Sequence, residues 1–191
     1  MNENEKAGGE APAQTPRMEL SWKFIFIVGI LLLAIRLFAA EPFLVYGSSM
    51  EPTFETGDYI IVDELTYRLE APQRGDVIVL KPPYDLTRHF IKRIIGLPGE
   101  TIDVKGQVVT ITTVDKKTIV LNEPYIKFPS DQVAHYDLSS TQYFVMGDNR
   151  SVSYDSRSWG PLPASDITGK AFLRLYPFNE ISLNPGKETS Y

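Results

Sequence analysis

The sequence predicts an all-β domain, built mainly of antiparallel sheets, that follows one N-terminal transmembrane helix. Two observations predict this fold: an apolar run near the N-terminus, and after it many short β-branched or aromatic runs separated by turn signals. The chain has 191 residues, and the roughly 150 residues after the apolar run are enough to bury a sizeable core. We therefore expect one anchor followed by one folded domain.

The composition excludes several classes of function. The net charge is -5, and acidic and basic residues are interspersed, so the chain lacks the electrostatic footprint of a nucleic-acid partner. There is no cysteine, which excludes disulfides, thiolate metal sites and a cysteine nucleophile. The two histidines, His89 and His135, make a histidine-based metal site improbable.

The N-terminal region predicts an arm and an anchor. Residues 1–21 carry almost no large apolar side chains, which is typical of a flexible arm. A helix over residues 22–40 would span about 28 Å, close to the roughly 30 Å of a hydrocarbon core. Trp22 is suited to one membrane interface, and Arg36 can extend its charge to the other.

Two other interpretations of the apolar run remain open, a cleaved signal peptide and a buried core helix. Ala39 and Ala40 offer the small residue of a cleavage site, but Phe38 stands where a second small residue is wanted. For a retained anchor, Arg17 and Lys23 precede the run and Glu41 follows it. This charge bias predicts a single-pass protein of the cell membrane with a cytoplasmic N-terminus and an extracytoplasmic domain.

Strand signals dominate residues 41–183, the predicted folded domain. Turn residues punctuate this region, including Arg74-Gly75-Asp76, which we interpret as a tight turn rather than an adhesion motif. Residues 184–191 are predicted to be a loose tail. Predicted strands cover 43–46, 59–62, 77–80, 142–146 and 171–176, and 108–113 with 118–121 form a predicted hairpin.

A serine lies in a constrained position in the run Gly47-Ser48-Ser49-Met50-Glu51-Pro52-Thr53. Gly47 gives the backbone conformations closed to other residues, and Pro52 fixes its own φ. A hydroxyl framed in this way is held at one angle, as a nucleophile requires. The alternative is a polar turn that leaves a membrane helix.

A lysine lies within an apolar strand pattern at residues 88–100. If this stretch is a strand, Lys92 shares one face with Phe90 and Ile94, and Arg93 lies on the other face. Burial among apolar groups can lower the pKa of a lysine by the roughly 3 units that a working base needs. Arg93 stays charged and can pair with a carboxylate. An inward lysine that guards an edge strand against aggregation is the alternative.

The third informative stretch, residues 146–160, balances two aspartates against two arginines. This balance favours an internally paired loop, and its serines could orient a neutral lysine by hydrogen bonding. A well-bonded surface loop would have the same composition.

Together these stretches resemble the signature boxes of bacterial type I signal peptidases, the membrane-anchored Ser–Lys proteases. Ser49-Met50-Glu51-Pro52-Thr53 resembles the nucleophile box, residues 91–100 the lysine box, and residues 147–157 the Gly-Asp-Asn-Arg … Ser-x-Asp-Ser-Arg box. The resemblance runs from about residue 41 to residue 163 in the family's order. The chain departs from it at Ser151 and Val152, where Asp-Asn is more usual.

The resemblance implies a role for each matching residue. Ser49 would be the nucleophile and Lys92 the neutral general base, with Ser153 holding the lysine amine. Asp148 would pair with Arg93, and Asp155 with Arg157. The Ser49 N–H would be the main oxyanion donor. Some members add a serine hydroxyl where this chain has Gly47, so the contributions of Gly47 and Ser48 stay open.

The implied reaction is hydrolysis of one peptide bond in exported preproteins, after a signal peptide with small residues at the -1 and -3 positions. The lipid bilayer is then a partner, and neither metal nor cofactor is implied. Two rivals remain. One is a hydrolase that uses Ser49 with His89 or His135, and the other is a non-enzymatic anchored or secreted β-domain for binding.

Overall fold

The computed structural model describes residues 21–37 and 40–187, and its contacts divide the chain into two units, Met1–Leu37 and Phe38–Tyr191. In the first unit, α1 (Trp22–Leu37) has 16 residues, and apolar side chains such as Phe24 and Ile27 are exposed. No helix in the described ranges combines the length and apolar character needed to cross a membrane. The predicted arm lies, except for Ser21, outside the described residues.

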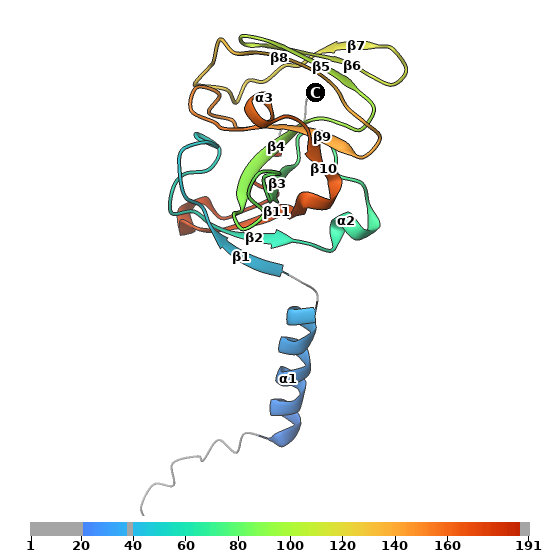
Figure 1. The fold of residues 1–191 in the computed structure, drawn as a ribbon. Coiled ribbons are helices and arrows are strands. Elements are labelled where there is room, and N and C mark those ends of the chain that lie inside the picture. Colours follow the sequence, from blue (N-terminus) through green and yellow to red (C-terminus); the bar gives the residue numbers. More distant parts are fainter. Residues whose placement is uncertain (1–20, 38–39, 188–191) are drawn as a thin grey trace, which may run out of the picture. The chain divides into compact units, whose positions relative to one another are not determined.

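The second unit contains an eight-stranded sheet and a four-stranded sheet (Figure 1). The larger sheet has the order β1-β2-β11-β3-β4-β9-β10, and β12 pairs with β11. All named strand pairs that the structure describes are antiparallel, which confirms the predicted mainly β fold. The strands of this sheet are β1 (Ala40–Leu44), β2 (Tyr59–Asp63), β3 (Val77–Leu80), β4 (Phe90–Gly96), β9 (Gln142–Met146), β10 (Leu162–Pro163), β11 (Ile167–Tyr176) and β12 (Ser182–Leu183).

The smaller sheet has the order β7-β6-β5-β8. Its strands are β5 (Thr101–Lys105), β6 (Val108–Thr112), β7 (Thr118–Val120) and β8 (Val133–Asp137). The predicted hairpin is confirmed as the β6–β7 pair. The prediction missed β5 and β8. Short helices complete the unit: α2 (Thr66–Leu69), α3 (Ser156–Trp159), η1 (Ala164–Asp166) and η2 (Phe178–Glu180).

The predicted strands at 77–80 and 142–146 have the bounds found in the structure. The strand expected at 43–46 instead ends at Leu44, because the chain turns away at Gly47, where φ is +89°. The strand expected to start at 171 starts at Ile167. Its first residues include Gly169, and a Cβ there would lie 2.6 Å from the carbonyl oxygen of Asp63, so the close approach to β2 requires glycine.

Three apolar clusters hold the two sheets and the loop that carries Ser49. Ile95, Phe144 and Met146 of the larger sheet pack with the inner face of the smaller sheet. Met50 and Phe54 anchor the Ser49 loop against one face of β3. Ile78 and Ile94 pack on the opposite face of β3 and β4. Successive residues of β4 therefore project into different environments.

The chain after β12 is packed onto the domain as far as it is described. Asn184 N–H donates to the Phe172 carbonyl, and Pro185 is buried. The predicted loose tail thus begins with an ordered turn, residues 184–187, which we name the tail turn. Residues 188–191 of that prediction lie outside the described part of the chain.

Candidate active site

Ser49 lies in the loop between β1 and β2. The loop starts where Gly47 adopts its positive φ, a backbone region that favours glycine. Met50 and Phe54, one and five positions after Ser49, are buried in the core, and the Phe54 N–H donates to the Met50 carbonyl over 3.0 Å. These apolar anchors place Ser49 in one position on the surface of the domain.

The stretch after β9 holds the Ser49 backbone directly. The Asn149 N–H donates to the Ser49 carbonyl over 3.0 Å. A Cβ on Gly147 would lie 2.4 Å from that carbonyl oxygen and 2.3 Å from Ser153 Oγ. Glycine at 147 is therefore required for the two loops to approach so closely.

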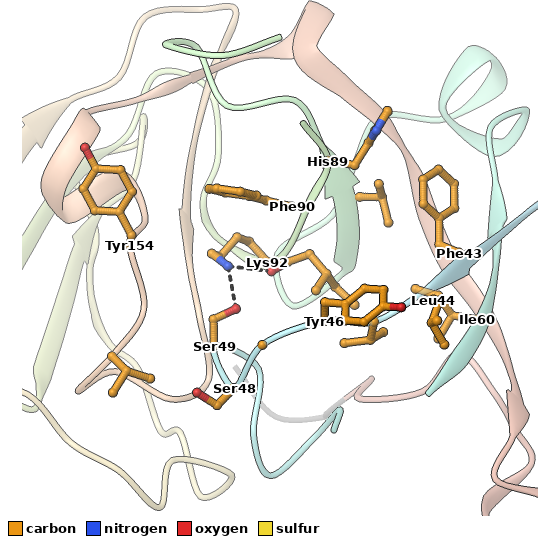
Figure 2. A pocket seen from close by; sticks show the side chains of 15 residues that line it. Phe43, Leu44, Tyr46, Ser48, Ser49, Ile60, His89, Phe90, Lys92 and Tyr154 are labelled. Atoms are coloured by element: carbon orange, nitrogen blue, oxygen red, sulfur yellow. Dashed lines mark hydrogen bonds between the residues drawn. The ribbon is translucent and has the colours of Figure 1, made fainter. Parts of the chain in front are cut away.

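Lys92 projects from β4 toward this loop, as Figure 2 shows. Its Nζ lies 2.8 Å from Ser49 Oγ, and it donates to the Ile91 carbonyl over 2.8 Å. The Phe90 ring centroid is 5.3 Å from Nζ. Lys92 pairs across the sheet with Ile78, which places it on the predicted face together with Phe90 and Ile94.

The Lys92 amine is almost completely removed from water, with 3% of the residue exposed. Because burial disfavours the charged form, the pKa of Lys92 falls from 10.5 to about 8, although the charges of Asp155 and Asp148 oppose this shift. An appreciable fraction of the amine is therefore neutral near neutral pH, and a neutral amine can accept a proton from the Ser49 hydroxyl.

Arg93, the next residue on β4, forms a buried ion pair. Its Nε donates to Asp148 Oδ1 over 2.8 Å and its Nη2 to Asp148 Oδ2 over 2.5 Å. Neither side chain is more than 1% exposed. Thr53 Oγ1 donates to the same Asp148 carboxylate over 2.5 Å. Asp148 thus connects the Lys92 strand to the loop that carries Ser49.

Asp155 and Arg157 form the second predicted pair. Arg157 donates from Nε and Nη2 to the two Asp155 carboxylate oxygens, each over 2.8 Å. Gly147 N–H also donates to Asp155, over 3.0 Å. Burial alone would raise the pKa of Asp155, but the Arg157 and Gly147 hydrogen bonds outweigh it and hold the pKa below its usual value. The ionised carboxylate fixes the start of the loop behind Ser49.

Ser153 is the predicted site residue whose contacts are weakest. Its hydroxyl is buried and makes no hydrogen bond of standard geometry with a described residue, although it lies close enough to the Asp155 carboxylate to help lower the pKa of Asp155. It lies next to Gly147, on the Ser49 side of the loop, but the hydrogen bonds of Lys92 given by the structure go to Ser49 and Ile91. Its role toward the lysine stays a prediction.

Several supporting residues were not identified from the sequence. Arg150 donates from Nε to the Gly147 carbonyl over 3.0 Å and forms two hydrogen bonds with Glu123. The Tyr125 hydroxyl donates to Glu123, and the Tyr125 ring lies 4.2 Å from the Arg93 guanidinium. The segment after β7 therefore supports both sides of the site. The only sequence signal for this role was the run Asn-Glu-Pro-Tyr at residues 122–125, in which three of the four side chains can form hydrogen bonds.

A pocket of about 360 Å³ opens beside the two side chains. Its walls are largely apolar or aromatic and come from β1, β2, β3, β4 and the loops after β1 and β9 (Figure 2). Residues 43–49, Ile60, Val79, 89–92, Val152 and Tyr154 line it. Within the described residues, His, Asp and Glu side chains form no group of three that could hold a metal ion.

Comparison with known proteins identifies the group to which these features belong. The sequence model of the family described as "Signal peptidase, peptidase S26" matches residues 18–176. The chain is 39% identical to signal peptidase I of Leptolyngbya laminosa, over 92% of this chain and 87% of that protein. It is 38% identical to signal peptidase I U of Bacillus subtilis, over 82% of this chain and 87% of that protein.

A solved structure is similar as well. The crystal structure of a signal peptidase I from Enterococcus faecalis matches 53% of this chain and 97% of its own chain, with 27% identity and a TM-score of 0.44. The family match and the curated relatives extend over most of the sequence. The chain therefore belongs to the signal peptidase family, peptidase S26.

Proposed function

We propose that this signal peptidase removes signal peptides from exported preproteins with a catalytic dyad of Ser49 and Lys92. The observation that carries the proposal is the 2.8 Å separation of Ser49 Oγ and Lys92 Nζ, together with a lysine pKa of about 8. A nucleophile needs a base within about 2.6–3.2 Å whose pKa is near the working pH. Both conditions hold in this pair.

The mechanism follows from these positions. Lys92 Nζ takes the proton while Ser49 Oγ attacks the scissile carbonyl carbon, and the Ser49 N–H stabilises the oxyanion. The ammonium then gives its proton to the departing amine nitrogen, which leaves an ester on Ser49. A water molecule attacks that ester with Lys92 again as the base, and the acid product leaves. The Ser48 side chain points away from Lys92 in Figure 2, so Ser49 is the serine suited to this role.

The supporting residues have distinct tasks in this proposal. The Asp148–Arg93 and Asp155–Arg157 pairs would fix the position of the segment after β9 relative to Ser49 and Lys92. Ser153 would orient the lysine amine once the amine turns from the Ile91 carbonyl. The apolar pocket beside the dyad would take the small side chains at the -1 and -3 positions of the substrate.

The proposal includes the cellular setting. The apolar run at 22–40 would anchor the chain in the cell membrane as a single pass, with a cytoplasmic N-terminus and the domain on the outer side. The lipid bilayer would then be a partner, because the signal peptide of the substrate is itself held at the membrane. Protease protection of the domain in sealed spheroplasts and inside-out vesicles tests this topology.

Cleavage of a preprotein in detergent tests the dyad. Wild type, Ser49→Ala and Lys92→Ala are compared, with Ser48→Ala as the matched control, and the cleavage point is read by mass spectrometry. We expect both dyad variants to lose roughly 1,000-fold or more in kcat while staying folded. Retained cleavage by Ser49→Ala would contradict the dyad, whereas a folded wild type that cleaves no preprotein would favour the non-enzymatic binding domain.

A further inference from the structure

The tail turn, residues 184–187, packs against the buried Arg93–Asp148 ion pair. The Gly186 carbonyl accepts a hydrogen bond from Arg93 Nη1, although the two residues are 93 positions apart in the sequence. Pro185 is buried, and the turn closes with a hydrogen bond of 3.1 Å from Lys187 N–H to the Asn184 carbonyl. The pairing of β12 with β11 fixes where this turn begins.

The space around Gly186 admits no side chain. A Cβ at this position would lie 2.6 Å from Thr53 Cγ2, 3.1 Å from Arg93 Nη2 and 3.2 Å from Val77 Cγ2. Its φ is +76°, in the left-handed region that favours glycine. Gly186 therefore presents its carbonyl to Arg93 at a distance that another residue could not reach without displacing Thr53.

Two of the three residues that surround Gly186, Arg93 and Thr53, are connected to the dyad through Asp148. Arg93 and Thr53 each hydrogen-bond the Asp148 carboxylate. Asp148 lies between Gly147 and Asn149 in the chain, and the Asn149 N–H holds the Ser49 carbonyl. A displacement of Arg93 or Thr53 would therefore shift the segment whose Asn149 N–H holds the Ser49 carbonyl.

We propose that the tail turn is a latch for the dyad, a set of contacts that holds Ser49 and Lys92 in their reactive positions. Gly186 is then a positioning residue of the reaction, which acts through Arg93, Thr53 and Asp148. The inference rests on the proposed Ser49–Lys92 function and extends it to the C-terminal end of the domain. Its physical basis is the demand of a buried guanidinium for acceptors at its N–H groups. The Gly186 and Gly75 carbonyls serve Nη1, on the side away from Asp148.

The test compares Gly186→Ala with Gly106→Ala. Gly106 also has a positive φ, of +61°, but a Cβ there meets nothing closer than 3.9 Å, and it lies in the turn between β5 and β6, away from the dyad. Both variants carry the backbone cost of alanine in this region, and only the first moves Thr53. We expect Gly186→Ala to lower kcat by roughly tenfold or more with little change in KM, because misplacement of reacting groups by about 1 Å costs on the order of 100-fold.

Gly106→Ala should keep kcat within about twofold of wild type, as expected for a substitution away from the site. A rescue variant sharpens the comparison. Thr53→Ser removes the methyl group that the alanine Cβ would strike and keeps the hydroxyl that donates to Asp148. The double variant Gly186→Ala/Thr53→Ser should recover most of the lost kcat, and Thr53→Ser alone supplies the fourth corner of the cycle.

Equal kcat values for Gly186→Ala and Gly106→Ala, or no recovery in the folded double variant, would overturn the latch while Ser49→Ala still tests the dyad separately. Amide hydrogen exchange at Asn149 provides a readout independent of turnover. Exchange faster in Gly186→Ala than in Gly106→Ala supports the latch, and identical exchange contradicts it. Both outcomes can be read even if wild type cleaves no preprotein.

Discussion

Lys92 and Arg93 are neighbouring basic residues on opposite faces of β4, and their environments differ in the charge of the group that each side chain contacts. Lys92 is buried beside Phe90 and within reach of a neutral hydroxyl, and its pKa is lowered to about 8. Arg93 is buried against the Asp148 carboxylate with two hydrogen bonds. Burial therefore lowers the pKa of the amine on one face, whereas the guanidinium on the other face stays charged, because it does not lose its proton and a carboxylate compensates its charge.

The largest effect on kcat is expected when both faces of β4 carry an arginine. Lys92→Arg places a group that cannot lose its proton opposite Ser49. We expect kcat for preprotein cleavage to fall on the order of 1,000-fold, close to the value of Lys92→Ala. Single-turnover cleavage with circular dichroism as the folding control measures this, and substantial activity in Lys92→Arg would exclude a neutral base at this position.

Removing the cation from the other face should affect stability. Arg93→Met leaves the buried Asp148 carboxylate without its main partner, and the loss of one member of a buried pair typically costs about 3–5 kcal/mol of unfolding free energy. Arg88→Met is the control, because the Arg88–Asp85 pair is exposed and such pairs contribute only about 0–1 kcal/mol. Urea denaturation of both variants reports the difference, and similar losses would contradict the contrast between a buried pair and a surface pair.

Lys92→Met should stabilise the fold at neutral pH. The pKa of Lys92 is lowered in the folded state from 10.5 to about 8, so between these values the unfolded chain binds more protons and stability rises with pH. The penalty is fully present below about pH 8, amounts to roughly 3 kcal/mol at most, and disappears above the unfolded pKa.

The gain from Lys92→Met over wild type should therefore be largest near pH 7 and shrink toward pH 10.5 or so. Chemical denaturation at several pH values checks this, with the exposed Lys117→Met as the control. A gain independent of pH would mean that better packing, rather than relief of a desolvated charge, is responsible.

The same pKa predicts a smaller effect in wild type. Because only the neutral amine is a base, kcat/KM should rise about tenfold between about pH 6 and pH 7 and flatten above about pH 8. Initial rates across this range, in buffers of constant ionic strength, report the ascending limb. An ascending limb centred near pH 10 would show that the lysine keeps its ordinary pKa.

The smallest effect is expected from the histidines. His89 contacts the Phe43 ring, with centroids 5.3 Å apart, and His135 pairs with Asp103 on the smaller sheet. We expect His135→Ala, at a surface position, to change kcat by less than about twofold, and His89→Ala, which lines the pocket, to change KM more than kcat. A loss of kcat on the order of 1,000-fold in either variant would instead favour the hypothesis that a histidine is the base for Ser49.

The opposite faces of β4 could be predicted because strand alternation is a local property with a period of two residues. The unusual backbone at Gly47 was also predictable from a local signal, because glycine is the residue most often found where φ is positive. The strands β5 and β8 were missed because polar residues such as Asp103, Lys105 and His135 occupy their outer face, which weakens the apolar pattern.

Partners that are distant in the sequence could not be predicted from local pattern. Arg150 with Glu123 and Arg93 with Gly186 depend on the packing of the two sheets and of the tail turn. The hydroxyl of Thr53 gave no sign that it would bind Asp148, because a threonine in a loop is equally common at the surface. The resemblance supplied the Arg93–Asp148 and Asp155–Arg157 pairs, and the geometry of both is present.

The alternation on β4 also limits how this chain can evolve. One residue deleted just before Lys92 would move its side chain to the face of the strand that now carries Arg93, away from the Ser49 hydroxyl. The guanidinium would then face Ser49, and the protein could remain folded but would have no base. Insertions and deletions should therefore accumulate in the loops on either side of this strand, and the strand itself should keep its length.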